Sequence, residues 1–180
     1  MFWSRLLGAV VLAYVVFIVP PAILPKRILE LGAVVGLVFL TLAAFGRIWC
    51  LVFVAGRKDD VLVTEGPYSL VRNPLYAFSF LGALGFGLAA ENPILAAILA
   101  LAFGLYYAFV VRREERFLAE RFGATFHDYV ARTPRWLPRF RAYHEPSTIS
   151  VTPARIRAGI LESMWFVWAY FILELLQVSR

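Results

Sequence analysis

The sequence predicts an all-α fold, a polytopic transmembrane helical bundle of about five spans with a cytoplasmic juxtamembrane helix. Hydrophobic residues make up 61% of the 180-residue chain and the mean hydropathy is +0.73, far above the level of an ordinary soluble domain. A hydrocarbon core about 30 Å thick requires roughly 20 apolar residues per helix, so four or five spans leave no room for a separate soluble domain. Ten arginines accompany five acids between residues 112 and 157, which places that stretch in the cytoplasm by the positive-inside rule.

The first predicted span is residues 6–24, an uncharged run that ends in a proline-rich stretch. A secretory signal is the alternative, because Arg5 precedes the run. The run is long and no small-residue cleavage site follows it, so we favour a retained helix.

The second predicted span is residues 29–55. It contains Gly32 and Gly36 at a G-x-x-x-G spacing, which lets another helix approach closely, and simple helix packing is the preferred interpretation. Arg47 lies inside the same segment and would cost about 2.5 to 3.5 kcal/mol at the bilayer centre. We expect it to snorkel toward the cytoplasmic surface or to line a polar cavity, and snorkelling is slightly favoured.

Residues 75–90 and 94–111 form two uncharged runs separated only by Glu91-Asn92-Pro93. Such a short turn-forming cluster predicts the tip of a helical hairpin, with the third and fourth spans antiparallel. With the arginine cluster in the cytoplasm, the loop 56–73 is cytoplasmic and the tip lies outside. The basic pair at 26–27 then falls outside, against the positive-inside rule.

A charged helix is predicted from Arg112 to about Ala131, continuing the fourth span along the membrane surface. Its apolar residues recur near the spacing of one helix face; they are Phe117, Leu118, Phe122, Phe126 and Tyr129. Residues 133–153 read as a connector without periodicity. Residues 156–178 are apolar apart from Glu162 and Glu174, and we expect a fifth span there rather than an interfacial helix.

Cysteine and histidine content excludes several kinds of site. Cys50 is the single cysteine, so disulfides within the chain and multi-cysteine metal sites are excluded, and a buried thiol is expected. His127 and His144 are too isolated for a zinc site, and we predict no metal. The net charge of +6 is explained by membrane orientation and by attraction to anionic lipid. Nucleic-acid binding is not favoured, because the basic cluster contains few aromatic residues on which bases could stack.

The stretch GPYSLVRNPLY, residues 66–76, carries the first candidate chemistry. Gly66-Pro67 predicts a turn, and Asn73-Pro74 predicts the start of the third span, because proline is tolerated in the first helical turn. A helix N-terminus suits an anion arriving from water, and Arg72 adds a planar cation. By themselves, a Gly-Pro turn and an Asn-Pro helix start are also typical of membrane proteins in which they only set the topology of the helices.

Two adjacent carboxylates, Glu114 and Glu115, lie at the cytoplasmic end of the fourth span. Consecutive helical residues point about 100° apart, so one of them faces inward while the other is solvated or paired with Arg112 or Arg116. A charged juxtamembrane face is the alternative interpretation.

These two elements, LVTEGPYSLVRNPLY and RREERFLAERFGATFHDYVARTPRWLPR, resemble the integral-membrane methyltransferases of the isoprenylcysteine carboxyl methyltransferase and phospholipid N-methyltransferase superfamily. The resemblance covers residues 47–139, about half the chain, and rests on the family patterns G-P-Y-x-x-x-R-H-P-x-Y-x-G, E-E-x-x-L and F-G-x-x-Y-x-x-Y. The matching residues are Gly66, Pro67, Tyr68, Arg72, Pro74, Tyr76, Glu114, Glu115, Leu118, Phe122, Gly123 and Tyr129. Asn73 replaces the usual histidine, Phe78 a glycine and Phe126 a tyrosine.

The resemblance implies an S-adenosylmethionine pocket between the loop, the ends of the third and fourth spans and the juxtamembrane helix. The cofactor would enter from the cytosol, while a lipidic or small lipophilic acceptor, such as a phospholipid amine or a prenylcysteine or isoprenoid carboxylate, enters from the bilayer. The residues assigned to the cofactor are Gly66, Tyr68, Val71, Arg72, Asn73, Tyr76, Gly82, Gly85 and Glu115. Arg72 and Glu114 are the catalytic candidates. Arg72 orients the acceptor or the methionine carboxylate, and Glu114 or water takes the proton of an amine acceptor.

The predicted organisation is therefore N-terminal helices in residues 1–55, a methyltransferase core in residues 56–140, and a connector with a C-terminal membrane helix in residues 141–180. The partners are membrane lipids and the acceptor, and the location is a bacterial or archaeal inner membrane with the active site facing the cytoplasm. Two alternatives remain open. One is a sterol-reductase-like enzyme using NADPH, for which no additional basic pocket for a 2'-phosphate is evident. The other is a non-catalytic helical scaffold in which the two motifs only set topology.

Overall fold

The computed structural model describes residues 24–57 and 60–178, and every regular element in these ranges is helical. The helices are α2 (Lys26–Val54), α3 (Pro67–Leu70), α4 (Pro74–Ala89), α5 (Pro93–Phe122), α6 (Ala124–Arg132), the 3-10 turn η1 (Phe140–Ala142), α7 (Pro153–Ser163) and α8 (Trp165–Val178). The first predicted span, residues 6–24, lies almost wholly outside the described residues.

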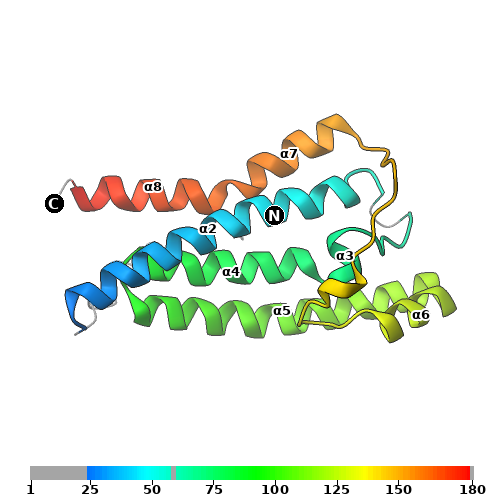
Figure 1. Cartoon of the computed structure of the whole chain (residues 1–180), viewed down its shortest axis with the longest axis horizontal. Helices are drawn as coiled ribbons and strands as arrows, with labels where there is room; N and C mark the ends of the chain where they lie inside the picture. Colours follow the sequence, from blue (N-terminus) through cyan, green and yellow to red (C-terminus); the bar gives the residue numbers. More distant parts are fainter. Residues whose placement is uncertain (1–23, 58–59, 179–180) are drawn as a thin grey trace.

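The long helices lie side by side. Figure 1 shows α4 between α2 and α5, with α7 and α8 on the other side of α2, and the helix contacts agree with this order. The short elements α3, η1 and α6 gather at one end of the bundle, while the turn between α4 and α5 lies at the opposite end. The arrangement brings the loop before α4 and the charged end of α5 to the same end of the molecule.

Of the described helices, α2 and α5 are long and apolar enough to cross a membrane by length and composition. Their flanks expose large apolar side chains: Leu31 and Phe45 on α2 are 68% and 70% exposed, and Phe109 on α5 is 68% exposed. α4 is also apolar but has 16 residues, about 24 Å of helix, which is shorter than the hydrocarbon core.

Close packing of α2 against α4 depends on glycine. A Cβ on Gly36 would lie 2.3 Å from the amide nitrogen of Ala89, and a Cβ on Gly85 would lie 2.9 Å from the carbonyl oxygen of Gly36. The predicted packing role is confirmed for Gly36, whereas Gly32 faces open space. Next to this crossing, Leu40 and Phe86 form the buried core with Ala89 and Leu95.

The predicted hairpin is confirmed. The Asn92 side chain accepts a hydrogen bond from the Leu95 amide at 3.0 Å, and Pro93 occupies the first turn of α5. Glu91 adopts a positive φ of 53° in the turn. The side-chain cap and the proline start α5 immediately after the reversal.

The predicted juxtamembrane helix is divided. α5 continues without interruption through the charged residues to Phe122, and Gly123, with φ 51°, separates it from α6. Phe126 and Tyr129 are buried, whereas Phe117 is 44% exposed, so the apolar residues do not share one face. The expectation of one amphipathic helix from residue 112 to residue 131 is wrong because the glycine redirects the chain.

The segment predicted as a fifth span, residues 156–178, is not one continuous helix, because it is divided at Met164 into α7 and α8. Each half packs on a different part of the bundle. Gly159 of α7 lies against the Leu51 side chain at the end of α2. Tyr170 of α8 packs against the core around Leu40.

Candidate active site

The loop before α4 is fixed by a glycine turn. Gly66 has a φ of 59°, and a Cβ there would lie 2.3 Å from the ring of Phe53 on α2, so the position requires glycine. The Gly66 amide donates to the carbonyl oxygen of His144 at 2.8 Å, and the Ser69 hydroxyl donates to the Gly66 carbonyl oxygen at 2.6 Å. The turn therefore joins α2, α3 and the late connector.

The connector after α6 runs along this loop and is tied to it through the backbone. The Arg72 amide donates to the carbonyl oxygen of Pro134, and the Arg139 amide donates to the carbonyl oxygen of Leu70, both at 2.9 Å. These bonds bring Arg135 beside the end of α5.

Glu115 on α5 is the centre of the site and is 8% exposed. Its Oε1 lies 3.2 Å from Arg72 Nη1 and accepts hydrogen bonds from Asn73 Nδ2 at 3.3 Å and Arg135 Nε at 3.2 Å. Its Oε2 accepts a hydrogen bond from Arg135 Nη2. One buried carboxylate thus joins α5, the turn before α4 and the connector.

The cluster carries an excess positive charge, because two guanidinium groups share one carboxylate. The Arg72 side chain is 13% exposed, and its Nε is buried with no hydrogen-bond partner among the described residues. A buried N–H without an acceptor is costly, so this atom is a ready donor to an incoming anion.

The neighbouring Glu114 has a different environment. Its Oε2 accepts a hydrogen bond from the Tyr76 hydroxyl at 2.7 Å, and its side chain is half-buried. The Tyr76 ring packs against Tyr107 of α5 with a centroid distance of 4.9 Å. The two adjacent acids separate, and Glu115 is the one that faces inward, against arginines. The expectation that the other acid is solvated or paired with Arg112 or Arg116 is wrong, because Glu114 is half-buried and bonds Tyr76 of α4.

Two further tyrosines support the loop. The Tyr129 hydroxyl of α6 donates to the carbonyl oxygen of Tyr68 at 2.7 Å. Burial raises the pKa of Tyr68 well above its ordinary value and also raises the pKa of Tyr129, so both phenols are neutral at physiological pH.

The structure gathers most of the predicted site residues at one end of the bundle. Those in α3, in the turns on either side of it, in the first turn of α4 and in the charged part of α5 are Gly66, Tyr68, Val71, Arg72, Asn73, Tyr76, Glu114 and Glu115. Gly82 and Gly85 lie further along α4, about 12 and 16 Å from Pro74 along the axis. Gly85 packs against Gly36, so its environment is the helix crossing.

Sequence reasoning missed Arg135, which makes two of the hydrogen bonds to Glu115. The available signal was its position within the string RTPRWLPR, which belongs to the quoted resemblance. The snorkelling preference for Arg47 is wrong: its Nη1 donates to the Ser79 hydroxyl of α4, so the side chain turns into the bundle.

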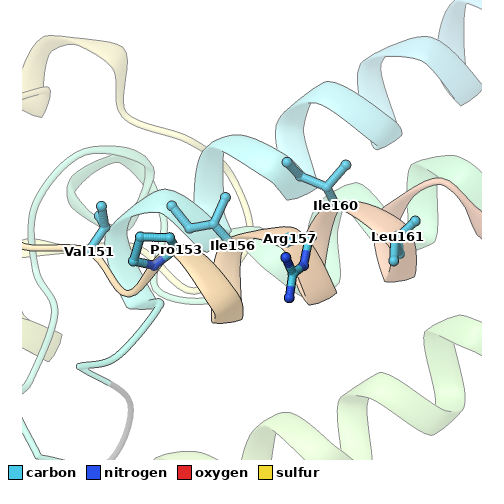
Figure 2. A pocket seen from close by; sticks show the side chains of 6 residues that line it. All are labelled: Val151, Pro153, Ile156, Arg157, Ile160 and Leu161. Carbon is cyan, nitrogen blue, oxygen red and sulfur yellow. The ribbon is translucent and has the colours of Figure 1, made fainter.

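A shallow hollow of about 350 Å³ lies on α7, away from this cluster (Figure 2). It is lined by Val151, Pro153, Ile156, Arg157, Ile160 and Leu161, none of which belongs to the predicted site. Its wall is almost entirely apolar, so it offers no set of polar groups for a nucleoside cofactor.

Comparison with known proteins identifies the family. The sequence profile described as phospholipid methyltransferase matches residues 32–125, more than half of the chain, from the second turn of α2 to the start of α6. The chain belongs to the phospholipid methyltransferase family. The family resemblance drawn from the two motifs is thus confirmed.

Curated relatives of this family member fall into two groups. The cobalt-zinc-cadmium resistance protein CzcN of Cupriavidus metallidurans is 43% identical over 77% of this chain and 64% of its own length. The nickel-cobalt-cadmium resistance protein NccN of Alcaligenes xylosoxydans is 40% identical over 81% of this chain and 68% of its own length. The protein-S-isoprenylcysteine O-methyltransferase of Schizosaccharomyces pombe is 30% identical over 46% of this chain and 35% of its own length.

The chain thus spans about two thirds of the metal-resistance relatives and about one third of that O-methyltransferase. No solved structure matches it. The family description and the O-methyltransferase relative name methyl transfer, whereas the names of the two metal-resistance relatives do not.

Proposed function

We propose that the chain is an S-adenosylmethionine-dependent methyltransferase that transfers a methyl group to a lipidic or small lipophilic acceptor at the cytoplasmic membrane interface. The observation that carries this proposal is the cluster of Arg72, Glu115 and Arg135 at the end of apolar helices. A polar, charged cofactor and a bilayer-soluble acceptor can meet only at such a boundary.

The residues present fit the polar end of the cofactor. The buried Arg72 Nε lacks an acceptor, and the cluster has a net positive charge, so an amino acid carboxylate would satisfy both. When bound, S-adenosylmethionine supplies a methyl group on a positively charged sulfur. Glu115 acts here as a positioning residue, because its two oxygens hold Arg72 and Arg135 in place.

On the acceptor side, Glu114 and Tyr76 form the polar edge of the apolar bundle. An amine acceptor must lose a proton before its lone pair forms the bond to the methyl carbon, while the bond to sulfur breaks and leaves its electrons on sulfur. Glu114 is positioned to take that proton, and the Tyr76 hydroxyl orients the carboxylate. The rest of the catalytic effect comes from alignment of the two reactants.

The proposed arrangement in the membrane is multi-pass, with about five spans counting residues 6–24 and the α7–α8 segment, in a bacterial or archaeal inner membrane. The arginine-rich end of α5 and the connector carry the excess positive charge and face the cytoplasm. The active site then opens to the cytosolic supply of the methyl donor.

The names of two relatives support a role in metal tolerance. Methylation of a lipid amine to a quaternary ammonium removes a nitrogen lone pair that binds transition metals and leaves a fixed positive charge on the surface. We therefore expect cells expressing the chain to tolerate more cobalt, zinc or cadmium than cells expressing Glu114→Gln. Equal tolerance in both strains would contradict this role.

Calorimetry on detergent-solubilised protein tests the enzyme proposal directly. We expect binding of S-adenosylmethionine and of its demethylated product, and a large loss of affinity in Arg72→Ala and Glu115→Ala. Arg113→Ala is the matched control, because this exposed arginine lies on the same helix as Glu115 and outside the cluster. Absence of binding heat when S-adenosylmethionine is added to the folded wild-type protein would refute the proposal. In a separate assay, consumption of NADPH during saturation of a double bond would favour the reductase alternative.

A further inference from the structure

The connector between α6 and α7 exposes large apolar side chains that the proposed mechanism does not use. Leu137 and Phe140 are 82% and 74% exposed, and Trp136 and Tyr143 beside them are also exposed. We call these four side chains the connector patch. So much apolar surface on one short segment is unfavourable in water, so the patch requires a partner that covers it.

The connector patch lies beside α2, near the apolar flank of that helix. The ring centroids of Tyr143 and Trp49 of α2 are 6.0 Å apart. Trp49 follows Phe45 by four residues, so the two share one helix face and are about 6 Å apart along the axis. Phe45 belongs to the exposed apolar flank of α2, which is apolar enough to cross a membrane. The patch therefore continues a surface that faces lipid.

The backbone holds the connector at this position. The Arg139 amide donates to the carbonyl oxygen of Leu70 in α3 at 2.9 Å, and the Gly66 amide donates to the carbonyl oxygen of His144 at 2.8 Å. Between these two bonds, η1 lies against α3 (Figure 1). The patch is thus part of a fixed surface, so little chain entropy is lost when a partner covers it.

The charged residues within the connector patch are all basic. Residues 129–144 contain four arginines and no acid. Arg139 and Arg141 alternate with the apolar side chains and are exposed. The next acid along the chain is Glu145, whose carboxylate accepts a hydrogen bond from the Tyr143 hydroxyl. The partner that complements this surface is therefore apolar on one side and anionic on the other.

We propose that the connector patch is a docking surface for the headgroup layer of an anionic lipid bilayer. Tryptophan and tyrosine rings are typical of this layer, and arginine stems lie along apolar surface while their guanidinium groups reach the phosphates. Leu137 and Phe140 then enter the boundary of the acyl chains, and Arg139 and Arg141 bind the anionic headgroups. This docking goes beyond the proposed function, because it does not require methyl transfer.

Docking has a consequence for the cluster around Glu115. The connector patch begins one residue after Arg135, which makes two of the hydrogen bonds to Glu115. A bilayer that holds the patch also holds the segment from which Arg135 reaches the buried carboxylate. The membrane surface thereby stabilises the closed arrangement of this end of the bundle.

The test measures the membrane depth of a fluorophore on the full chain in nanodiscs of phosphatidylcholine and phosphatidylglycerol. Cys50→Ala removes the single thiol, and Leu137→Cys then carries an NBD label. We expect blue-shifted emission and strong quenching by a nitroxide on the upper acyl chain of the lipid. Thr125→Cys with the same label is the matched control, because this exposed residue of α6 lies outside the patch and should remain in water.

A second comparison isolates the arginines. Replacing phosphatidylglycerol by phosphatidylcholine should weaken quenching of the Leu137→Cys label, because each arginine near an anionic surface contributes roughly fivefold to occupancy of the docked state. The double variant Arg139→Gln with Arg141→Gln should remove this lipid dependence. Arg121→Gln should keep it, because Arg121 is an exposed arginine at the end of α5 that pairs with Asp60.

Equal quenching of the two labels would overturn the proposal, and so would quenching of the Leu137→Cys label that does not depend on phosphatidylglycerol. Protection of this label only in nanodiscs that hold two copies of the chain would assign the patch to a second copy and would also overturn it. No readout uses S-adenosylmethionine, so failure of the proposed enzyme function leaves these outcomes unchanged.

Discussion

Replacement of Glu115 by glutamine would remove the negative charge that two arginines share. Arg72 and Glu115 have side chains only 13% and 10% exposed, so Arg72 would remain as a buried, uncompensated cation. Breaking a buried ion pair lowers the free energy of unfolding by about 3 to 5 kcal/mol. The side-chain oxygen of the glutamine still accepts a hydrogen bond, so we expect a loss near the lower figure. The Arg135 side chain is 39% exposed, so solvent screening limits the contribution of the Arg135–Glu115 pair to stability to less than about 1 kcal/mol.

The expected total loss is about 3 to 4 kcal/mol, which corresponds to a fall in Tm of roughly 6 to 16 °C for a chain of this size. The single cysteine provides the assay. Cys50 is fully buried, so a thiol-reactive fluorophore reports its exposure as detergent-solubilised protein unfolds on heating. The profile should remain one transition and move to lower temperature.

Glu114→Gln is the matched control, one residue away on the same helix. Glu114 is half-buried and bonds a tyrosine hydroxyl, to which the glutamine oxygen still offers an acceptor, so we expect a loss of less than about 1 kcal/mol. The double variant Glu115→Gln with Arg72→Leu removes both charges and should lose less stability than the sum of the single variants. Equal Tm values for the two glutamine variants would refute the assignment of Glu115 as the buried carboxylate that pairs with Arg72 and Arg135.

Three further predictions concern packing and protonation. Gly36→Leu should lower Tm by many degrees because its Cβ would lie 2.3 Å from the Ala89 amide nitrogen, whereas Gly32→Ala, in open space, should leave Tm unchanged or raise it slightly. Tyr129→Phe loses the hydrogen bond to the Tyr68 carbonyl and should cost about 1 kcal/mol in the same melting assay, with a larger effect contradicting a single-bond role. Alkaline pH should destabilise the protein, because the pKa values of Tyr68 and Tyr129 in the folded state lie above the ordinary value of 10.0. Their stabilising effect is complete below pH 10.0 and is lost as the pH rises above that value, since the unfolded chain then releases the two protons more readily than the folded protein. Tyrosinate absorbance that appears fully before unfolding would refute this last expectation.

Local signals in the sequence were sufficient where one short segment determines the structure. The hairpin at Asn92-Pro93 follows from a cap and a proline in adjacent positions, and the start of α4 at Pro74 follows in the same way. The separation of Glu114 from Glu115 also follows from helix geometry, although the sequence alone did not show which of the two turns inward.

Other features depend on residues distant in the chain and could not be deduced from periodicity. Arg135 reaches Glu115 only because the connector is hydrogen-bonded to the loop before α4. The direction of Arg47 depends on Ser79, 32 residues later. The division of the C-terminal segment at Met164 reflects packing of its two halves on different parts of the bundle.

The contact between Gly66 and Phe53 links the loop before α4 to the tilt of α2. α2 has 29 residues, about 43 Å of helix, which exceeds the hydrocarbon thickness of about 30 Å. A helix of this length tilts further in a thin bilayer than in a thick one. The Phe53 ring of α2 packs directly against the backbone of Gly66, so tilting α2 moves the loop that carries Arg72. The acyl-chain length of the surrounding lipid would then change the position of the Arg72 loop, and with it the rate of the proposed methyl transfer, without any lipid touching that loop.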